Sequence, residues 1–566
     1  MKYSLLLILL LTFSINCYAQ NFELQLKANS LLESKIIDSL NYISKHKNIK
    51  SITNEIEATS QKLSKLGYIE NRVIEQLTQN DSTYITWFSL GVKIELLHIY
   101  VRTDPIITKL LTPAPTQDSI FLPYTDVERF LNENTAALER KGYSLAKLKL
   151  TNIHQKSNTL FTDLQFESEK ARQLNAIVIK HKNKEQNKNF PAGYLTQINR
   201  KYRNKTFNQD IVTKIYNEFQ KFSFVSQTKY PEILFTKDST KVYLYLDNKK
   251  SNTFDGYLGF SNNENKKITL NGYLDITLEN TLQVGEKFSL YWKTDGNKQR
   301  IFNTSLELPY LFKTPIGLKA QLNIFKQDSL FQNTKTEIAI SYIADHNTRT
   351  YIGYQSTTSS DIQNSNSSII ADFNNKFTTA TIDYSKLENG NTLFYKKSAL
   401  FFKTGLGKRE LNNQTESSEK QKQFFIELEA MHNFYLNSKH TINLKTQNYY
   451  LQSSNYLNNE LHRFGGVNSI RGFIENSLSA NLMTAIITEY RYIVSPSVYF
   501  HTILDYCWLQ DTTTPKKTTN LLGLGIGFGV QTPSGILKIS IANGGVQSQK
   551  INFYNTIIHI SYNVKF

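Results

Sequence analysis

The stretch Phe464-Gly465-Gly466-Val467-Asn468-Ser469-Ile470-Arg471-Gly472-Phe473 is the most informative part of this 566-residue chain. It forms a glycine-dense loop that carries one arginine, and it lies within a run of segments in which apolar and polar residues alternate. An arginine in such a loop can bond a carboxylate in two places, and it stays charged when partly removed from water. The surrounding segments decide what this loop belongs to.

Alternation with a period of two begins after Thr253 and continues to the end of the chain. We predict sixteen strands, which begin near residues 254, 267, 285, 298, 316, 334, 348, 379, 394, 420, 439, 481, 497, 519, 535 and 556. One row of side chains, such as Leu537, Ile539 and Ile541, is apolar, whereas Lys538 and Ser540 between them are polar. This pattern is typical of a transmembrane barrel with a lipid-facing row and a polar lumen.

The lengths of the connections give an independent check on this count. Connections after even-numbered strands are short, for example Lys313-Thr314-Pro315 and Asp345-His346-Asn347, and those after strands seven, nine and eleven are the longest. Outer-membrane barrels have short periplasmic turns and longer external loops. If the first strand leaves the periplasm, the Arg471 loop joins strands eleven and twelve and is the sixth external loop.

The last strand ends on an aromatic residue. Ile558, Ile560, Tyr562, Val564 and Phe566 alternate with polar residues up to the carboxy terminus. With Tyr562, Val564 and Phe566 in this phase, the segment resembles the terminal signal by which barrel proteins are recognised. The alternative is an ordinary amphipathic strand.

The loop resembles the Gly-Gly-x-x-Ser-Val/Ile-Arg-Gly-Phe/Tyr motif in the sixth external loop of the BamA/TamA-like outer-membrane assembly superfamily. The matching residues are Gly465, Gly466, Ser469, Ile470, Arg471, Gly472 and Phe473. The resemblance implies periplasmic POTRA domains, followed by a sixteen-stranded antiparallel barrel of the bacterial surface antigen type. The layout is closer to that of TamA than to that of BamA, which usually carries five POTRA units.

The resemblance also implies a partner for Arg471 in the barrel lumen. In the family this arginine meets an acidic residue on strand thirteen within a Phe-x-Asp-x-Gly pattern. Asp505 matches the acidic position, while Ile503 and Cys507 depart from Phe and Gly. Glu489 on strand twelve is a second candidate partner. The alternatives are that Arg471 merely lines a basic lumen and that Glu489 is a solvated lumen charge.

The first half of the mature chain repeats a helical segment, a Gly-Tyr stop and strands. The stops Gly67-Tyr68 and Gly142-Tyr143 lie 75 residues apart, which suggests a repeated α+β unit. We place POTRA-like units at residues 30–102, 120–170 and 173–248, with residues 113–116 as the linker between the first two. The third unit has the order strand, helix, helix, strand, strand, which is similar to a POTRA domain. The alternative is an unrelated α+β repeat array.

The amino terminus reads as a secretory signal peptide over residues 1–19, with a basic residue, a short apolar run and small residues at the cleavage site. Lipid modification of Cys17 is the less favoured alternative. Cleavage leaves Cys507 as the only cysteine, which excludes an internal disulfide. The net charge of +17 would suit nucleic acid or an anionic surface as a partner, but export argues against nucleic acid, and a basic lumen beside anionic lipid headgroups fits the charge. The 33 tyrosines and 34 phenylalanines fit aromatic girdles at the membrane interfaces.

No motif for catalysis, a metal or a cofactor is apparent. Gly523, Gly525, Gly527 and Gly529 follow a strict period of two inside a strand, so they fit space for an inserted loop, or a bend in the wall, better than a nucleotide site. We expect a non-enzymatic protein of the bacterial outer membrane with POTRA units in the periplasm. By the resemblance, it inserts or exports unfolded outer-membrane or secreted client proteins. Outer-membrane lipid and a periplasmic or inner-membrane-anchored protein are further expected partners. The alternative function is a passive channel or a secretion pore dedicated to one substrate.

Overall fold

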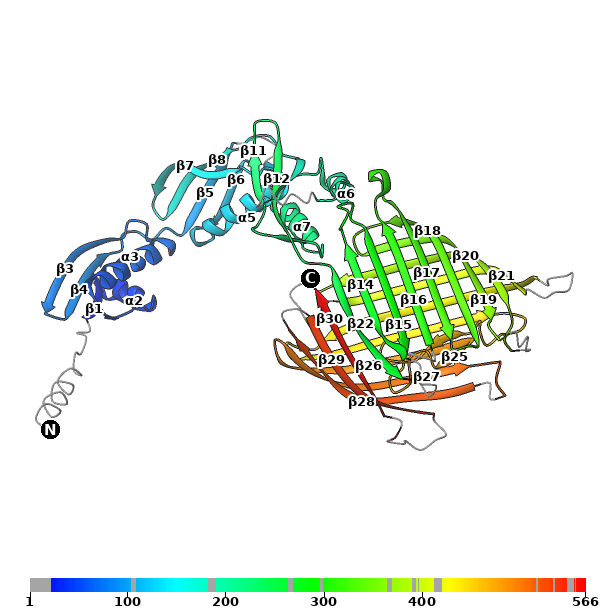
Figure 1. Ribbon diagram of the computed structural model, residues 1–566. Helices are drawn as coiled ribbons and strands as arrows, with labels where there is room; N and C mark the ends of the chain where they lie inside the picture. Colours follow the sequence, from blue (N-terminus) through cyan, green and yellow to red (C-terminus); the bar gives the residue numbers. More distant parts are fainter. Residues whose placement is uncertain are drawn as a thin grey trace, which may run out of the picture. The chain divides into compact units, whose positions relative to one another are not determined.

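The computed structural model describes residues 22–102, 108–181, 190–262, 268–295, 299–363, 369–388, 393–394, 396–411, 420–515, 518–532, 535–546, 554 and 556–565. The described chain contains three small α+β units, each built on one sheet, followed by a closed antiparallel barrel of sixteen strands (Figure 1). The predicted fold class is therefore confirmed. Residues 1–19, which carry the predicted signal peptide, lie outside the described residues, as does Phe566.

The first unit begins earlier than predicted. Its sheet has the order β2-β1-β4-β3, in which β1 (Phe22–Ala28) pairs in parallel with β4 (Thr83–Ser89). The remaining elements are α2 (Leu31–Ser39), β2 (Lys45–His46), α3 (Ile49–Lys65) and β3 (Arg72–Asn80). Gly67 takes a φ of +107° just after α3, as expected for a left-handed helix stop, and a Cβ at this position would lie 2.2 Å from the carbonyl oxygen of Ile94.

The second unit corrects the predicted boundary. Strand β5 (Leu96–Val101), which we assigned to the first unit, pairs with β6 (Ser119–Pro123) and β8 (Thr159–Glu167) in the sheet β6-β5-β8-β7. Its alternating apolar residues enter the second core, and alternation alone does not reveal which sheet a strand joins. Residues 113–116 consequently lie between two strands of the second sheet and do not link the units. The helix α5 (Val127–Arg140) and strand β7 (Lys147–Lys156) complete the unit.

The third unit has the predicted order of elements, with one additional short strand, β10, after the two helices. It contains β9 (Leu174–His181), α6 (Ala192–Tyr202), α7 (Gln209–Phe219), β10 (Val225–Gln227), β11 (Glu232–Phe235) and β12 (Thr240–Asn248). Strand β12 is central, since β9, β10 and β11 all pair with it.

The barrel strands follow one another around the wall in sequence order, and β30 closes against β13. They are β13 (Thr253–Asn262), β14 (Ile268–Glu279), β15 (Lys287–Asp295), β16 (Gln299–Leu308), β17 (Ile316–Gln327), β18 (Phe331–Ile343), β19 (Thr348–Asp361), β20 (Phe373–Leu387), β21 (Lys396–Leu411), β22 (Lys420–Tyr435), β23 (His440–Gln452), β26 (Leu482–Ser495), β27 (Val498–Gln510), β28 (Thr518–Gln531), β29 (Gly535–Val546) and β30 (Thr556–Lys565). The largest displacement from a predicted start is at β20, which begins six residues early.

The two faces of the wall differ as the alternation predicts. On β18, Ile338, Ile340 and Tyr342 are exposed on the outside, whereas Glu337 and Ser341 are buried inside. An outer face of this kind is apolar enough to lie in lipid, and pairing between consecutive strands satisfies the backbone hydrogen bonds along the wall away from the seam of the first and last strands. No helix among the described residues is long and apolar enough to cross a membrane.

The seam between the first and last strands is short. Thr253 pairs with Lys565 and Phe254 with Val564, whereas β29 pairs with β30 from Gly535 to Asn543. Tyr562 lies in β30, and its hydroxyl is 3.0 Å from Oγ1 of Thr532. The terminal strand signal as a whole stays a prediction, because Phe566 is outside the described residues.

The third unit contacts a short turn of the barrel. Tyr194 of α6 packs edge-on against Tyr310, with ring centroids 4.5 Å apart, and Gln197 donates a hydrogen bond of 2.5 Å to the carbonyl oxygen of Lys313. Lys313 lies in the turn η2 (Leu311–Lys313) between β16 and β17. The predicted short-turn side of the barrel is thus the side that the third unit touches.

Candidate functional site

The candidate site is built around the loop that joins the eleventh and twelfth barrel strands, β23 and β26. We call residues 453–481 loop six. Two short strands within it, β24 (His462–Phe464) and β25 (Leu478–Ala480), pair with each other as a hairpin and not with the wall. The position of the loop in the strand order is the one predicted from the sequence.

Three glycines shape the turn that carries Arg471. Gly465, Gly466 and Gly472 have φ values of +108°, +93° and +88°, a region that other residues rarely adopt. The backbone N–H of Gly466 donates to the carbonyl oxygen of Ile470 at 3.1 Å, which closes the turn. Ile470 is fully buried, and Arg471 therefore projects from a fixed support.

Arg471 is buried and hydrogen-bonded through every nitrogen of its guanidinium group. Its Nε donates to Oδ2 of Asp505 at 2.8 Å and its Nη2 to Oδ1 at 2.5 Å, which makes the contact bidentate. Its backbone N–H also donates to Oδ2 of Asp505 at 3.0 Å. The Nη1 atom bonds Glu489, and Nη2 also donates to the carbonyl oxygen of Thr488 at 3.1 Å. The structure thus brings Arg471 to both candidate partners.

Glu489 is shared by three cations. Besides Arg471, it accepts hydrogen bonds from Arg491 Nε at 2.7 Å and from Lys538 Nζ at 2.8 Å. We call Arg471, Arg491, Lys538, Asp505 and Glu489 the Arg471 centre. Because the charge of each carboxylate is matched by direct donors, the burial of these ions is compensated.

The loop approaches the wall where the wall has glycine. A Cβ on Gly523 of β28 would lie 2.4 Å from the carbonyl oxygen of Arg471, and a Cβ on Gly472 would lie 2.3 Å from the backbone nitrogen of Gly544. Of the glycines at alternate positions of β28, Gly523 makes room for the loop as expected. Gly527 and Gly529 have another role, because a Cβ there would meet the rings of His501 and Tyr499.

The two departures from the family pattern on strand thirteen are explained by packing. Ile503 and Cys507 are buried on the lumen side of β27 beside Asp505. Cys507 belongs to an apolar cluster with Ile470, Phe464 and Leu509, and Phe473 packs against the same cluster. The cluster thus packs against the base of the loop, and both Arg471 and Asp505 are buried beside it.

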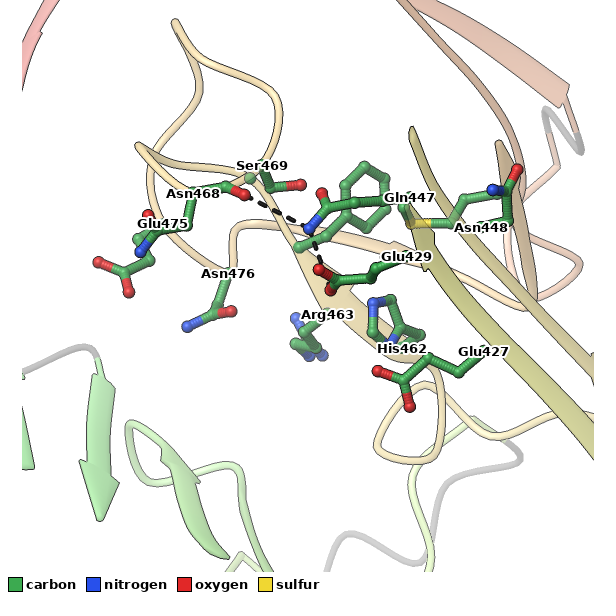
Figure 2. Close-up of a pocket in the computed structure, with 13 residues that line it drawn as sticks. Glu427, Glu429, Gln447, Asn448, His462, Arg463, Asn468, Ser469, Glu475 and Asn476 are labelled. Atoms are coloured by element: carbon green, nitrogen blue, oxygen red, sulfur yellow. Dashed lines mark hydrogen bonds between the residues drawn. The ribbon is translucent and has the colours of Figure 1, made fainter. Parts of the chain in front are cut away.

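A cavity lies beside loop six on the side of β22 and β23. Figure 2 shows Glu427, Glu429 and Gln447 facing His462 and Arg463 of the loop. Gln447 Nε2 donates to Glu429 at 3.2 Å and to the carbonyl oxygen of Asn468 at 3.3 Å. No group of three or more His, Cys, Asp or Glu residues within the described ranges could hold a metal ion.

One buried residue of the lumen, Arg409, was not singled out from the sequence. Arg409 on β21 has no exposed surface, and its side chain bonds Glu460 of loop six. The two residues are 51 positions apart, so no local pattern links them.

Comparison with solved structures establishes the fold. The crystal structure of BamA from Haemophilus ducreyi lacking POTRA domains 1–3 matches 83% of this chain and 99% of its own, with 15% identity and a TM-score of 0.50. The chain therefore shares the fold of BamA. CdiB from Acinetobacter baumannii matches with 15% identity over 84% of this chain and 90% of its own, with a TM-score of 0.49. CdiB from Escherichia coli matches with 13% identity over 90% of this chain and 98% of its own, with a TM-score of 0.47.

At these identities the likeness to BamA concerns the fold alone. No protein-family model matches the chain, and no curated protein matches its sequence. The resemblance inferred from the Arg471 loop is confirmed at the level of architecture.

Proposed function

We propose that this chain inserts or exports client proteins at the bacterial outer membrane, with its three α+β units in the periplasm. The observation that carries the proposal is the short seam of the barrel. Between β13 and β30 only the residues at one end are paired, and a wall that is weakest at one place can open there sideways. An opened seam presents unpaired strand edges, which are templates for a client strand.

The position of loop six argues against a permanently open channel. Its glycine turn is fixed to β27 and β28, and Glu475 bonds Lys293 on β15. A loop that reaches strands so far apart in the wall occupies part of the lumen. A passive pore is therefore the weaker alternative, while a secretion pore that opens for one substrate remains the rival function.

The first two units offer surfaces that suit extended polypeptides. Strand β3 is an edge strand that is exposed along its whole length, including Ile74 and Leu77. The second sheet carries four rings in register across its strands, which are Phe121, His98, Phe161 and His154. Neighbouring centroids lie 4.0, 5.2 and 5.4 Å apart. Burial lowers the pKa of His98, which favours its neutral form, and the row of rings suits apolar client side chains.

The proposed activity is not enzymatic. Client strands gain hydrogen bonds at the seam and bury apolar side chains in lipid, and both changes favour insertion without a cofactor. A periplasmic or inner-membrane-anchored protein that delivers the client to the α+β units is the expected partner.

Depletion of the protein, followed by quantitative proteomics of the outer membrane, tests the proposal. We expect many unrelated barrel proteins to decrease, and a strain with Arg471→Ala to reproduce part of the loss. The matched control is Arg463→Ala, an arginine of the same loop that bonds Asn458 and not the wall carboxylates. Loss of one secreted protein alone would identify a dedicated secretion pore, and an unchanged proteome would refute both functions.

A further inference from the structure

The beginning of loop six is held by its own buried ion pair, separate from the Arg471 centre. We call residues 453–461 the leading limb. Glu460 in this limb is buried, with 2% of its side chain exposed, and it forms a salt bridge with Arg409 on β21, whose side chain is completely buried. Both carboxylate oxygens accept hydrogen bonds. Oε2 accepts from Arg409 Nη1, and Oε1 accepts from Gln423 Nε2 at 2.6 Å and from Asn375 Nδ2 at 3.0 Å.

Arg409 bonds a second residue of the leading limb and a neighbouring strand of the wall. Its Nη2 atom bonds Gln421 on β22 and Asn455 in the limb, while Nη1 bonds Glu460. A planar guanidinium with donors in several directions can make these contacts together, which a lysine cannot. We call Arg409, Glu460, Gln421, Gln423 and Asn455 the Arg409 centre.

Neighbouring residues extend the attachment over five consecutive strands. Asn459 donates to Ser359 Oγ on β19 and to the carbonyl oxygen of Ala371, both at 2.8 Å, and its own carbonyl oxygen accepts from Asn333 on β18 at 2.6 Å. With Asn375 on β20, these contacts join the limb to every strand from β18 to β22. The Arg471 centre uses β26, β27 and β29 instead, and no residue belongs to both centres.

The chemistry of the limb suits reversible attachment. Leu457 and Leu461 show that apolar residues can pack in this segment, yet the wall contacts are mainly amides and one ion pair. A buried ion pair adds little net stability over apolar packing, but it gives a specific geometry, and its separated ions are readily hydrated in a water-filled lumen. An apolar limb would resist release into water, whereas this limb can be released and reattached.

We propose that Arg409 and Glu460 form a second lock that holds the leading limb across the lumen, so that the lumen opens fully only when this lock and the Arg471 centre are both released. Arg409 is a positioning residue in this scheme, since it acts through the loop. The inference deepens the proposed function, because it assigns the control of lumen opening during client passage.

The lock is tested by single-channel conductance of the purified full-length protein in planar lipid bilayers, without a client. Glu460→Gln preserves the size of the side chain and removes its charge. We expect a rise of roughly tenfold or more in the ratio of open to closed dwell times for Glu460→Gln and Arg409→Ala, since hydrogen bonds to charged groups shift equilibria by that order. The charge exchange Arg409→Glu with Glu460→Arg should bring the ratio back toward that of the natural protein.

Glu427→Gln is the matched control, because Glu427 also lines the lumen beside loop six and forms no ion pair within the described part of the chain. Its conductance should equal that of the natural protein. Folding of each variant is checked by the heat-dependent shift of the barrel band on a gel, and if Arg409→Ala does not fold, the isosteric Glu460→Gln decides.

Two results would overturn the lock. One is a folded Glu460→Gln protein that conducts like the natural protein, and the other is a folded charge-exchanged protein that conducts like the single variants. Because no client is present, neither result depends on the proteomic test, which can fail separately. If dwell times change but no client is lost on depletion, the lock stands and the proposed function falls.

Discussion

Loop six is attached to the barrel by two buried arginines that are placed in opposite ways. In the Arg471 centre the arginine lies in the loop and the carboxylates of Asp505 and Glu489 lie on the wall. In the Arg409 centre the arginine lies on the wall and the carboxylate of Glu460 lies in the loop. At these two centres the loop supplies one charge of each sign, and each meets its opposite on a different part of the wall. This arrangement specifies the direction in which the loop crosses the lumen as well as its attachment.

The two centres also differ in how completely they are bonded. Every guanidinium nitrogen of Arg471 has a partner, whereas Nε of Arg409 has none in the described structure. Arg471 follows a turn fixed by glycines, while the leading limb has no comparable turn. We therefore expect the Arg471 centre to be the stronger attachment and the Arg409 centre to be the one that releases first.

The largest expected effect comes from removing each arginine in turn. Arg471→Ala leaves Asp505 buried without a cation, and we expect a loss of about 3–5 kcal/mol of unfolding free energy. Arg409→Ala should cost less, because Glu460 keeps its bonds from Gln423 and Asn375. Urea unfolding in lipid vesicles, followed by tryptophan fluorescence, measures both. Equal losses would remove the distinction between a stronger and a weaker attachment.

A smaller effect should follow from filling the space between the turn and the wall. Gly523→Ala places a methyl group against the backbone of Arg471, and overpacking of this kind costs about 1–3 kcal/mol. Gly545→Ala on β29 is the matched control, since a Cβ there meets nothing within 4 Å. The same unfolding measurement applies. If both variants lose the same stability, the close seating of the turn is not what fixes it.

Exchanging arginine for lysine sharpens the comparison further. Arg409→Lys can keep an ion pair with Glu460 but loses the bonds to Gln421 and Asn455, and each such bond contributes about 0.5–1.5 kcal/mol. Its stability and its channel dwell times should lie between those of the natural protein and of Arg409→Ala. A lysine variant indistinguishable from Arg409→Ala would mean that the planar fork, and not the charge, makes the attachment.

The same contrast explains what the sequence could predict. The barrel followed from its period of two, and the Arg471 turn from glycines that a left-handed backbone requires. Asp505 is predicted as the partner of Arg471 only through the family resemblance. For Glu489 the sequence leaves two possibilities open, a second partner of Arg471 or a solvated lumen charge. Arg409 reads as an ordinary lumen charge in Lys408-Arg409-Glu410, and its partner becomes visible only when the loop folds back into the barrel. The misassigned strand β5 has the same origin, because alternation shows that a strand is half-buried but not against which core.

The smallest expected effect tests the charge balance of the Arg471 centre. Its cations Arg471, Arg491 and Lys538 outnumber its carboxylates Asp505 and Glu489 by one. Lys538 is the most exposed of the three cations, with 24% of its side chain accessible. When Lys538 is removed, Glu489 still forms salt bridges with Arg471 and Arg491. Lys538→Gln should therefore change the unfolding free energy by no more than about 1 kcal/mol. A loss as large as that of Arg471→Ala would show that the three cations act as one unit, and the attachment at Arg471 would then depend on β29 as much as on β27.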